Sequence, residues 1–184
     1  MAELFYLIGP SGAGKDSLIA HTRTHLAGCP PLIFAHRYIT RRADRGGENH
    51  VALSEREFRC RREQGCFSLC WQSHGFWYGL GREIDLWLDR GLHVVVNGSR
   101  GALGEAAQVY PKLRPVLIRA TPEAIAERLR RRGRESPKQI EERLARTRSL
   151  GEPQHPRLVV IDNDGPLEVA GLTLMRLLCS EARA

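Results

Sequence analysis

The sequence has no apolar run that approaches the roughly 20 residues of a membrane-spanning helix. It also has no signal-peptide layout, because Glu3 stands where a basic segment should be and a glycine-rich loop follows at once. These absences predict a cytoplasmic protein that does not span a membrane. We find no repeat, linker or low-complexity tract, and 184 residues with 42% hydrophobic content predict a single domain over residues 1–184 with a sizeable core.

Cysteine is scarce, and its pattern excludes two kinds of stabilisation. The five cysteines are odd in number and irregularly spaced, which argues against a disulfide framework. None forms the Cys-x2-Cys pair of a zinc site, and His21 and His25 lie one helical turn apart without a third ligand nearby. We therefore expect the cysteines to behave as small hydrophobic residues.

Positive charge is present but confined to two short stretches. Between Arg128 and Arg148 nine basic residues face three acidic ones, an excess of +6 out of a net +7. A smaller basic cluster runs from Arg37 to Arg45. Such runs are often solvated helix faces, and a nucleic-acid surface is another reading. The charge is too concentrated for a long nucleic-acid groove, so small anionic ligands are the better prediction.

Buried apolar runs alternate with helical patterns, which predicts an α/β fold with a parallel sheet. A capping box at Ser54–Glu57 and the pair Thr121-Pro122 each mark the start of a helix, and Gly133 marks a break. We expect short strands between Phe67 and Trp77. The other expected strands are Leu4–Ile8, Leu32–Ile39, His93–Val96, Val116–Ile118 and Leu158–Ile161, and the other expected helices are Lys15–Leu26, Arg82–Arg90, a stretch from Ser136-Pro137 onward and Leu167–Cys179.

The strongest motif follows the first expected strand. It has the spacing Gly-x4-Gly-Lys of a P-loop, or Walker A motif, between a strand and a helix. Backbone N–H groups of such a loop surround phosphate oxygens, the helix N-terminus adds positive potential, and the lysine reaches the β- and γ-phosphates. The predicted nucleotide-binding residues are Gly9, Pro10, Ser11, Gly12, Ala13, Gly14, Lys15, Asp16 and Ser17.

Asp16 replaces the Ser or Thr that usually binds Mg²⁺ in this motif, and Ser17 follows it. A carboxylate is a hard oxygen ligand, so Asp16 and Ser17 are the predicted metal ligands. The alternative is that Asp16 only caps the helix. Asn97 ends an expected buried strand, where many P-loop enzymes have an aspartate, and it could orient a metal-bound water without adding charge.

Several segments resemble the guanylate kinase family, and the resemblance covers nearly the whole chain. They are GPSGAGK, YITRRADRGGENH, ALSEREF, GFWYGL, RLRRRGRESPKQIEERLAR and VIDNDGPLEVA. The resemblance implies a P-loop NTPase fold with an acceptor-binding insertion at about residues 36–80 and an arginine-rich lid at about residues 128–148. It departs at the two carboxylates that read guanine, because Cys70 and Ser99 stand at those positions. A thiol and a hydroxyl are poor partners for the guanine N1–H and N2–H₂ groups.

With the segments GKDSL, HRYITR, ENHVALSE, YGLGREIDLWL, VVVNGSRG and RGRES, the chain resembles the ribose 1,5-bisphosphate phosphokinase family. That resemblance implies transfer of a phosphoryl group from ATP, with Mg²⁺, to ribose 1,5-bisphosphate, which gives 5-phosphoribosyl 1-diphosphate in phosphonate use. It implies a small phosphorylated sugar as partner and no nucleic acid. A nucleoside monophosphate kinase and a non-catalytic binding module of the same fold are the alternatives.

The resemblance also implies roles for individual residues. Lys15 and the lid residues Arg128, Arg132 and Arg143 are the predicted catalytic residues, with Arg134 and Arg146 as nearby candidates. For each arginine, surface solubility is the alternative. Spacing leaves open whether Arg42 or Arg45 joins Arg41 in the acceptor-phosphate clamp. The predicted acceptor-binding residues are Arg41, Arg45, His50, Tyr78 and Asn97.

Overall fold

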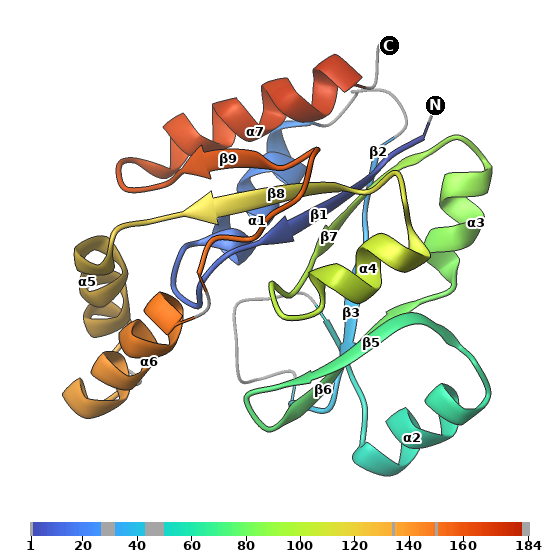
Figure 1. The fold of residues 1–184 in the computed structure, drawn as a ribbon, viewed down its shortest axis with the longest axis horizontal. Helices are drawn as coiled ribbons and strands as arrows, with labels where there is room; N and C mark the ends of the chain where they lie inside the picture. Colours follow the sequence, from blue (N-terminus) through green and yellow to red (C-terminus); the bar gives the residue numbers. More distant parts are fainter. Residues whose placement is uncertain (1, 27–31, 43–49, 134, 150, 182–184) are drawn as a thin grey trace.

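The computed structural model describes residues 2–26, 32–42, 50–133, 135–149 and 151–181. A five-stranded sheet with all neighbouring strands parallel forms its centre (Figure 1). Its strands lie in the order β2 (Leu32–Phe34), β7 (His93–Asn97), β1 (Leu4–Ile8), β8 (Arg114–Arg119) and β9 (Val159–Asp162).

Strand β1 explains why its sequence is apolar without alternation. Leu4, Tyr6 and Ile8 enter one hydrophobic core, and Phe5 and Leu7 enter the core on the opposite face of the sheet. All five side chains are at most 2% exposed. A strand buried on both faces needs apolar residues at every position, which is typical of parallel sheets covered by helices.

Helices cover both faces of the parallel sheet. The helices α1 (Lys15–His25) and α7 (Leu167–Glu181) pack against each other on one face. The helices α3 (Glu83–Asp89) and α4 (Leu103–Val109) contribute to the core on the other face. No helix within the described part of the chain has the length and apolar character needed to cross a membrane.

A second sheet shares the core with α3 and α4. Its strand order is β4 (His50–Ala52), β3 (Arg37–Ile39), β6 (Phe76–Gly81) and β5 (Phe67–Ser73). Helix α2 (Glu55–Glu63) packs on it through Phe58, whose ring stacks on Phe67 at 4.6 Å between centroids. Ser54 caps α2 by accepting a hydrogen bond from the Glu57 N–H at 3.1 Å, as the capping box predicts.

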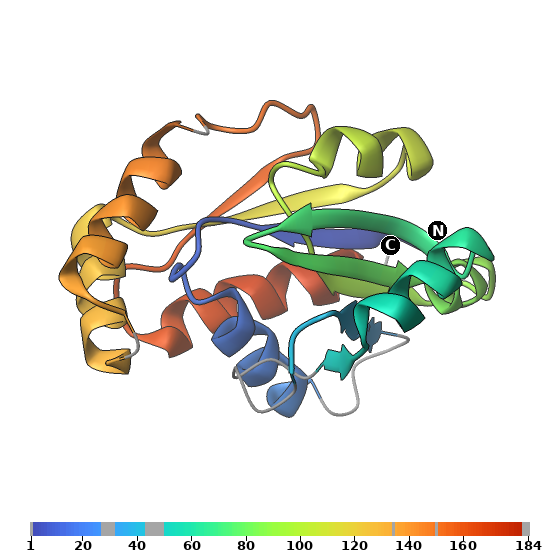
Figure 2. The same cartoon turned by 90° about the horizontal axis from the view of Figure 1, so that it is seen from below.

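Helices α5 (Pro122–Arg132) and α6 (Pro137–Ser149) form a separate pair at one end of the parallel sheet (Figures 1 and 2). The Thr121 hydroxyl accepts a hydrogen bond from the Ala124 N–H at 3.3 Å, and Gly133 ends α5 in the left-handed conformation. Figure 2 shows the P-loop end of β1 between this helix pair and the second sheet.

The expected α/β fold with a parallel sheet is confirmed, but one expected strand was wrong. Residues 32–39 form two strands in different sheets, because Leu32–Phe34 pairs with β7 and Arg37–Ile39 pairs with β6 and β4. The apolar pattern is continuous across this change of sheet, so periodicity could not reveal it. Strand β4 and helix α4 were not expected from the sequence.

Candidate active site

The P-loop follows β1 at the carboxyl edge of the parallel sheet. Gly14 has φ of 91°, and a Cβ atom there would lie 2.5 Å from Nδ2 of Asn163, so glycine is needed for both reasons. The Asn163 amide donates to the Ala13 carbonyl at 2.7 Å and ties the loop to the end of β9. The loop is therefore held rigidly from behind, with its helix N-terminus directed outward.

Lys15 begins α1, and its ammonium group lies over the loop. Nζ donates to the carbonyl oxygens of Gly9 at 2.7 Å and Pro10 at 3.1 Å. Gly14, without a side-chain hydrogen bond, is the N-cap of this 11-residue helix. The alternative reading of Asp16 as the cap is therefore wrong, and its carboxylate is available for another role.

Asp16 faces the end of the neighbouring strand β7. The Nδ2 group of Asn97 donates to Oδ1 of Asp16 at 2.5 Å. Asn97 is 6% exposed, and within the described residues its Oδ1 atom is buried without a hydrogen-bond partner. One carboxylate, one unsatisfied amide oxygen and the Ser17 hydroxyl beside phosphate-binding N–H groups fit Mg²⁺, which takes few protein ligands and keeps several waters.

The lid arginines of α5 and α6 reach the P-loop. The Arg143 guanidinium donates to the Ser11 hydroxyl at 2.9 Å and lies 3.2 Å from Oε1 of Glu135. Arg128 donates to the Ala13 carbonyl at 3.5 Å. Thus two of the three lid arginines contact the phosphate-binding loop itself. Arg134 and the Arg146 side chain lie outside the described residues.

A cavity of about 500 Å³ opens beside the P-loop. Arg132 lines it, together with Arg128 and the beginning of α7. Sequence reasoning missed Arg131, Asn163 and the turn after β9, although the segment VIDNDGPLEVA had been singled out. The lining residues are Gly12, Gly14, Ser17, Arg128, Arg131, Arg132, Asn163, Gly165, Pro166 and Leu167.

The acceptor candidates form a second group on the small sheet. Tyr78 is buried, stacks on Trp71 at 5.7 Å, and has the Arg37 guanidinium 5.0 Å from its ring centroid. Nε2 of His50 lies 3.1 Å from the Arg41 carbonyl oxygen, which can only accept, so this nitrogen carries the proton. Arg45 lies outside the described residues. Arg37 is 9% exposed and was missed as a candidate.

The positions of the two missing guanine-reading carboxylates hold uncharged groups. Cys70 lies half-buried on β5, and burial raises the pKa of its thiol above the usual value, although the nearby Arg62 charge lowers it. The backbone N–H of Ser99 is occupied by the Tyr6 hydroxyl at 3.0 Å. A neutral thiol and a serine present no anion here that could pair with a guanine edge.

A P-loop on a parallel sheet, a lysine, and lid arginines beside a cavity together define a P-loop phosphotransferase. Two solved structures share the fold. A guanylate kinase from Anaplasma phagocytophilum matches all of this chain and 87% of that protein, with a TM-score of 0.66 and 16% identity. A gluconokinase from Sinorhizobium meliloti 1021 matches 97% of this chain and 94% of that protein, with a TM-score of 0.53 and 20% identity. No protein-family model matches the chain.

Similarity to curated proteins narrows the class. A ribose 1,5-bisphosphate phosphokinase from Desulfomicrobium baculatum is 56% identical over 97% of this chain and 95% of its own length. Proteins of the same name from Thiobacillus denitrificans and Burkholderia pseudomallei are 55% and 51% identical, over 96% and 99% of this chain and 92% and 98% of theirs. The chain belongs to the ribose 1,5-bisphosphate phosphokinase family.

Proposed function

We propose that this chain transfers the γ-phosphoryl group of ATP to ribose 1,5-bisphosphate, giving 5-phosphoribosyl 1-diphosphate in the breakdown of phosphonates. The observation that carries the proposal is 51–56% identity to phosphokinases of that name over nearly the whole chain. The P-loop and lid supply the parts that phosphoryl transfer requires, which are positioning and neutralisation of charge.

The donor nucleotide would bind with its phosphates in the P-loop. The Lys15 ammonium, now on two loop carbonyls, would exchange one of them for a phosphate oxygen, a stronger acceptor because it is charged. The cavity between Arg128, Arg132 and the turn after β9 would then hold the rest of the nucleotide. This arrangement gives Asn163 two tasks, since it supports the loop and lines the cavity.

Asp16 and Ser17 would hold Mg²⁺, with Asn97 orienting a water through its Oδ1 atom. When bound, the ion would neutralise charge on the phosphates. The Asn97 amide fixes which way the Asp16 carboxylate turns, because its Nδ2 occupies one of the two carboxylate oxygens.

The lid arginines would neutralise the phosphoryl group in transfer. A guanidinium fork pairs with two phosphate oxygens, and Arg143 already reaches the Ser11 hydroxyl at the mouth of the loop. Arg128 and Arg132 face the cavity on the other side. Arginines on both sides of the phosphates would exclude water and favour transfer to the acceptor.

The acceptor clamp would be built from Arg41 and Tyr78, with Arg37 as an added cation. One phosphate of the acceptor would lie in the clamp while the other meets the γ-phosphate. An acceptor phosphate oxygen is already anionic near neutral pH, so it forms the new P–O bond without a general base, and the bond from the γ-phosphorus to ADP breaks. Of the described residues, we assign none as a catalytic base.

An acceptor panel tests the proposal. With ATP and Mg²⁺ fixed, kcat/KM is measured for ribose 1,5-bisphosphate, ribose 5-phosphate, GMP, AMP and CMP. We expect ribose 1,5-bisphosphate to exceed GMP by at least about 10²-fold, because a guanine edge left without partners loses binding energy. Arg41→Ala should raise the KM for the sugar while leaving that for ATP unchanged. A preference for GMP would overturn the proposal.

A further inference from the structure

The Tyr6 side chain lies on β1 directly beneath the turn that follows β7. Tyr6 is fully buried, and its hydroxyl accepts a hydrogen bond from the Ser99 N–H at 3.0 Å and lies 3.4 Å from the Ser99 carbonyl. Burial raises the pKa of Tyr6 to about 12, and its hydrogen bond to the Ser99 backbone opposes the shift. At neutral pH the hydroxyl therefore keeps its proton and can both accept and donate.

The turn fits the Tyr6 ring closely. A Cβ atom at Gly98 would lie 2.4 Å from the Tyr6 Cζ atom, so only glycine allows this approach. The Gly98 N–H donates to the Leu7 carbonyl at 2.7 Å and extends the pairing of β1 with β7, in which Leu7 faces Asn97. Ring contact, ladder and hydroxyl together fix the backbone on both sides of Asn97.

The orientation of Asn97 matters because its amide is asymmetric. Nδ2 donates to Asp16 at 2.5 Å, while Oδ1 is buried and has no partner among the described residues. A small rotation of the backbone would separate Nδ2 from the carboxylate and turn the unsatisfied oxygen away. An aspartate could bind a cation with either oxygen, but an asparagine has only one that accepts.

We infer that Tyr6 is a positioning residue, which holds the 97–99 turn so that Asn97 keeps Asp16 oriented toward the metal and phosphates. This inference rests on the proposed assignment of Asp16 to Mg²⁺. Tyr6 itself touches neither substrate nor metal. Residues that orient ligands through such contacts commonly change metal affinity or activity about 10–100-fold when removed.

Tyr6→Phe tests the inference, because it keeps the ring and removes only the hydroxyl. The affinity for ADP is measured by calorimetry with and without Mg²⁺, and needs no acceptor. We expect ADP affinity without Mg²⁺ to stay within about twofold of the wild type, while the gain that Mg²⁺ gives falls about tenfold. The kcat for the sugar should fall by a similar factor, and the KM for ATP without excess Mg²⁺ should barely change.

Tyr110→Phe is the matched control. Tyr110 is another partly buried tyrosine, and its hydroxyl donates to Asp85 on α3, away from the P-loop. This variant should bind ADP with the full gain from Mg²⁺. Equal losses in both variants, or an unchanged Mg²⁺ gain in Tyr6→Phe, would overturn the inference.

A double-mutant cycle separates positioning from general destabilisation. Tyr6→Phe is introduced into Asn97→Ala, where there is no amide left to position. We expect almost no further loss of the Mg²⁺ gain, and additive losses would count against the inference. If the wild type binds Mg²⁺-ADP and follows this pattern but leaves ribose 1,5-bisphosphate unphosphorylated, the proposed acceptor fails while the role of Tyr6 stands.

Discussion

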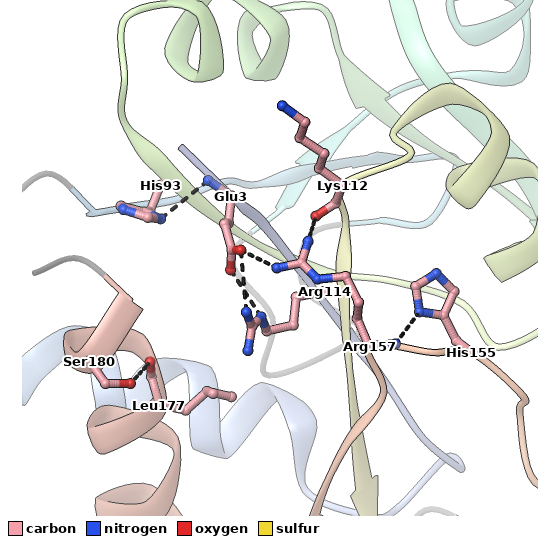
Figure 3. A network of polar contacts seen from close by, with 8 residues as sticks. All are labelled: Glu3, His93, Lys112, Arg114, His155, Arg157, Leu177 and Ser180. Atoms are coloured by element: carbon pink, nitrogen blue, oxygen red, sulfur yellow. Dashed lines mark hydrogen bonds and ion pairs between the residues drawn. The ribbon is translucent and has the colours of Figure 1, made fainter. Parts of the chain in front are cut away.

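At the amino edge of the parallel sheet, the Glu3 carboxylate lies between the guanidinium groups of Arg114 and Arg157 (Figure 3). Nε of Arg114 is 3.0 Å from the Glu3 carboxylate, whose side chain is 13% exposed. The Glu3 N–H donates to Nδ1 of His93 at 3.2 Å. An internal carboxylate thus neutralises much of the basic charge here.

At the carboxyl edge the cations meet mainly uncharged oxygens. Lys15 and Arg128 contact backbone carbonyls, and Arg143 divides its contacts between the Ser11 hydroxyl and Glu135. Carbonyl and hydroxyl oxygens satisfy hydrogen bonds without cancelling charge. The comparison teaches that basic side chains at one edge stabilise the fold, while those at the other keep a positive potential for a phosphate ligand.

Lys15→Ala should have the largest effect on this contrast. It removes the charge that follows the transferred phosphoryl group, so kcat should fall by about 10³-fold or more with little change in unfolding. Lys112→Ala is the control at the amino edge, where the described hydrogen bond of Lys112 uses its backbone carbonyl. Near-normal kcat in folded Lys15→Ala would show that Lys15 is not catalytic.

Arg143→Ala and Arg132→Ala should each lower kcat about 10²-fold and change the KM for ATP much less, because the lid acts chiefly in the closed state. Steady-state kinetics with varied ATP provide the measurement. Arg130→Ala serves as the control, since Arg130 is exposed on the same helix and does not line the cavity. Weaker ATP binding at unchanged kcat would contradict a closing lid.

Glu3→Gln should change stability and leave kcat unchanged. We expect a loss of about 1–3 kcal/mol in the free energy of unfolding, since two arginines lose their charged partner. Burial raises the pKa of Glu3, but Arg157 and Arg114 together outweigh it and lower the pKa below 4.5. Its contribution is therefore present above that pH and lost as the pH falls through the lowered value.

Urea titrations from about pH 7 to about pH 3 would measure this contribution. The wild type should lose more stability than Glu3→Gln over the acidic part of the range, so the two curves should converge. Parallel curves would show that the carboxylate has the same pKa in the folded and unfolded states.

Asp162→Asn should have the smallest effect. Asp162 pairs with Arg119 at 2.6 Å at the carboxyl ends of β8 and β9, and the two side chains are 60% and 50% exposed. Because water screens exposed pairs, neither the unfolding curve nor kcat should change measurably. A loss as large as that of Glu3→Gln would remove the distinction between the two edges.

Local patterns predicted the elements whose causes are local. The P-loop follows its strand, and the caps at Ser54 and Thr121 begin helices as expected, because each depends on residues only a few positions apart. The split of residues 32–39 depends on which distant strand each half pairs with. Arg37 escaped notice for the same reason, since its contact with Tyr78 joins residues on different strands.

The sequence by itself determined the phosphate-binding loop, the basic lid and the family, because motif spacing and composition are properties of the chain alone. Only the tertiary structure decided that Asn97 meets Asp16 and that Tyr6 lies beneath Gly98. Those contacts join residues 81 and 92 positions apart, as numbered in the chain. No local pattern encodes them, since parallel pairing brings together strand ends that a long crossover connection separates.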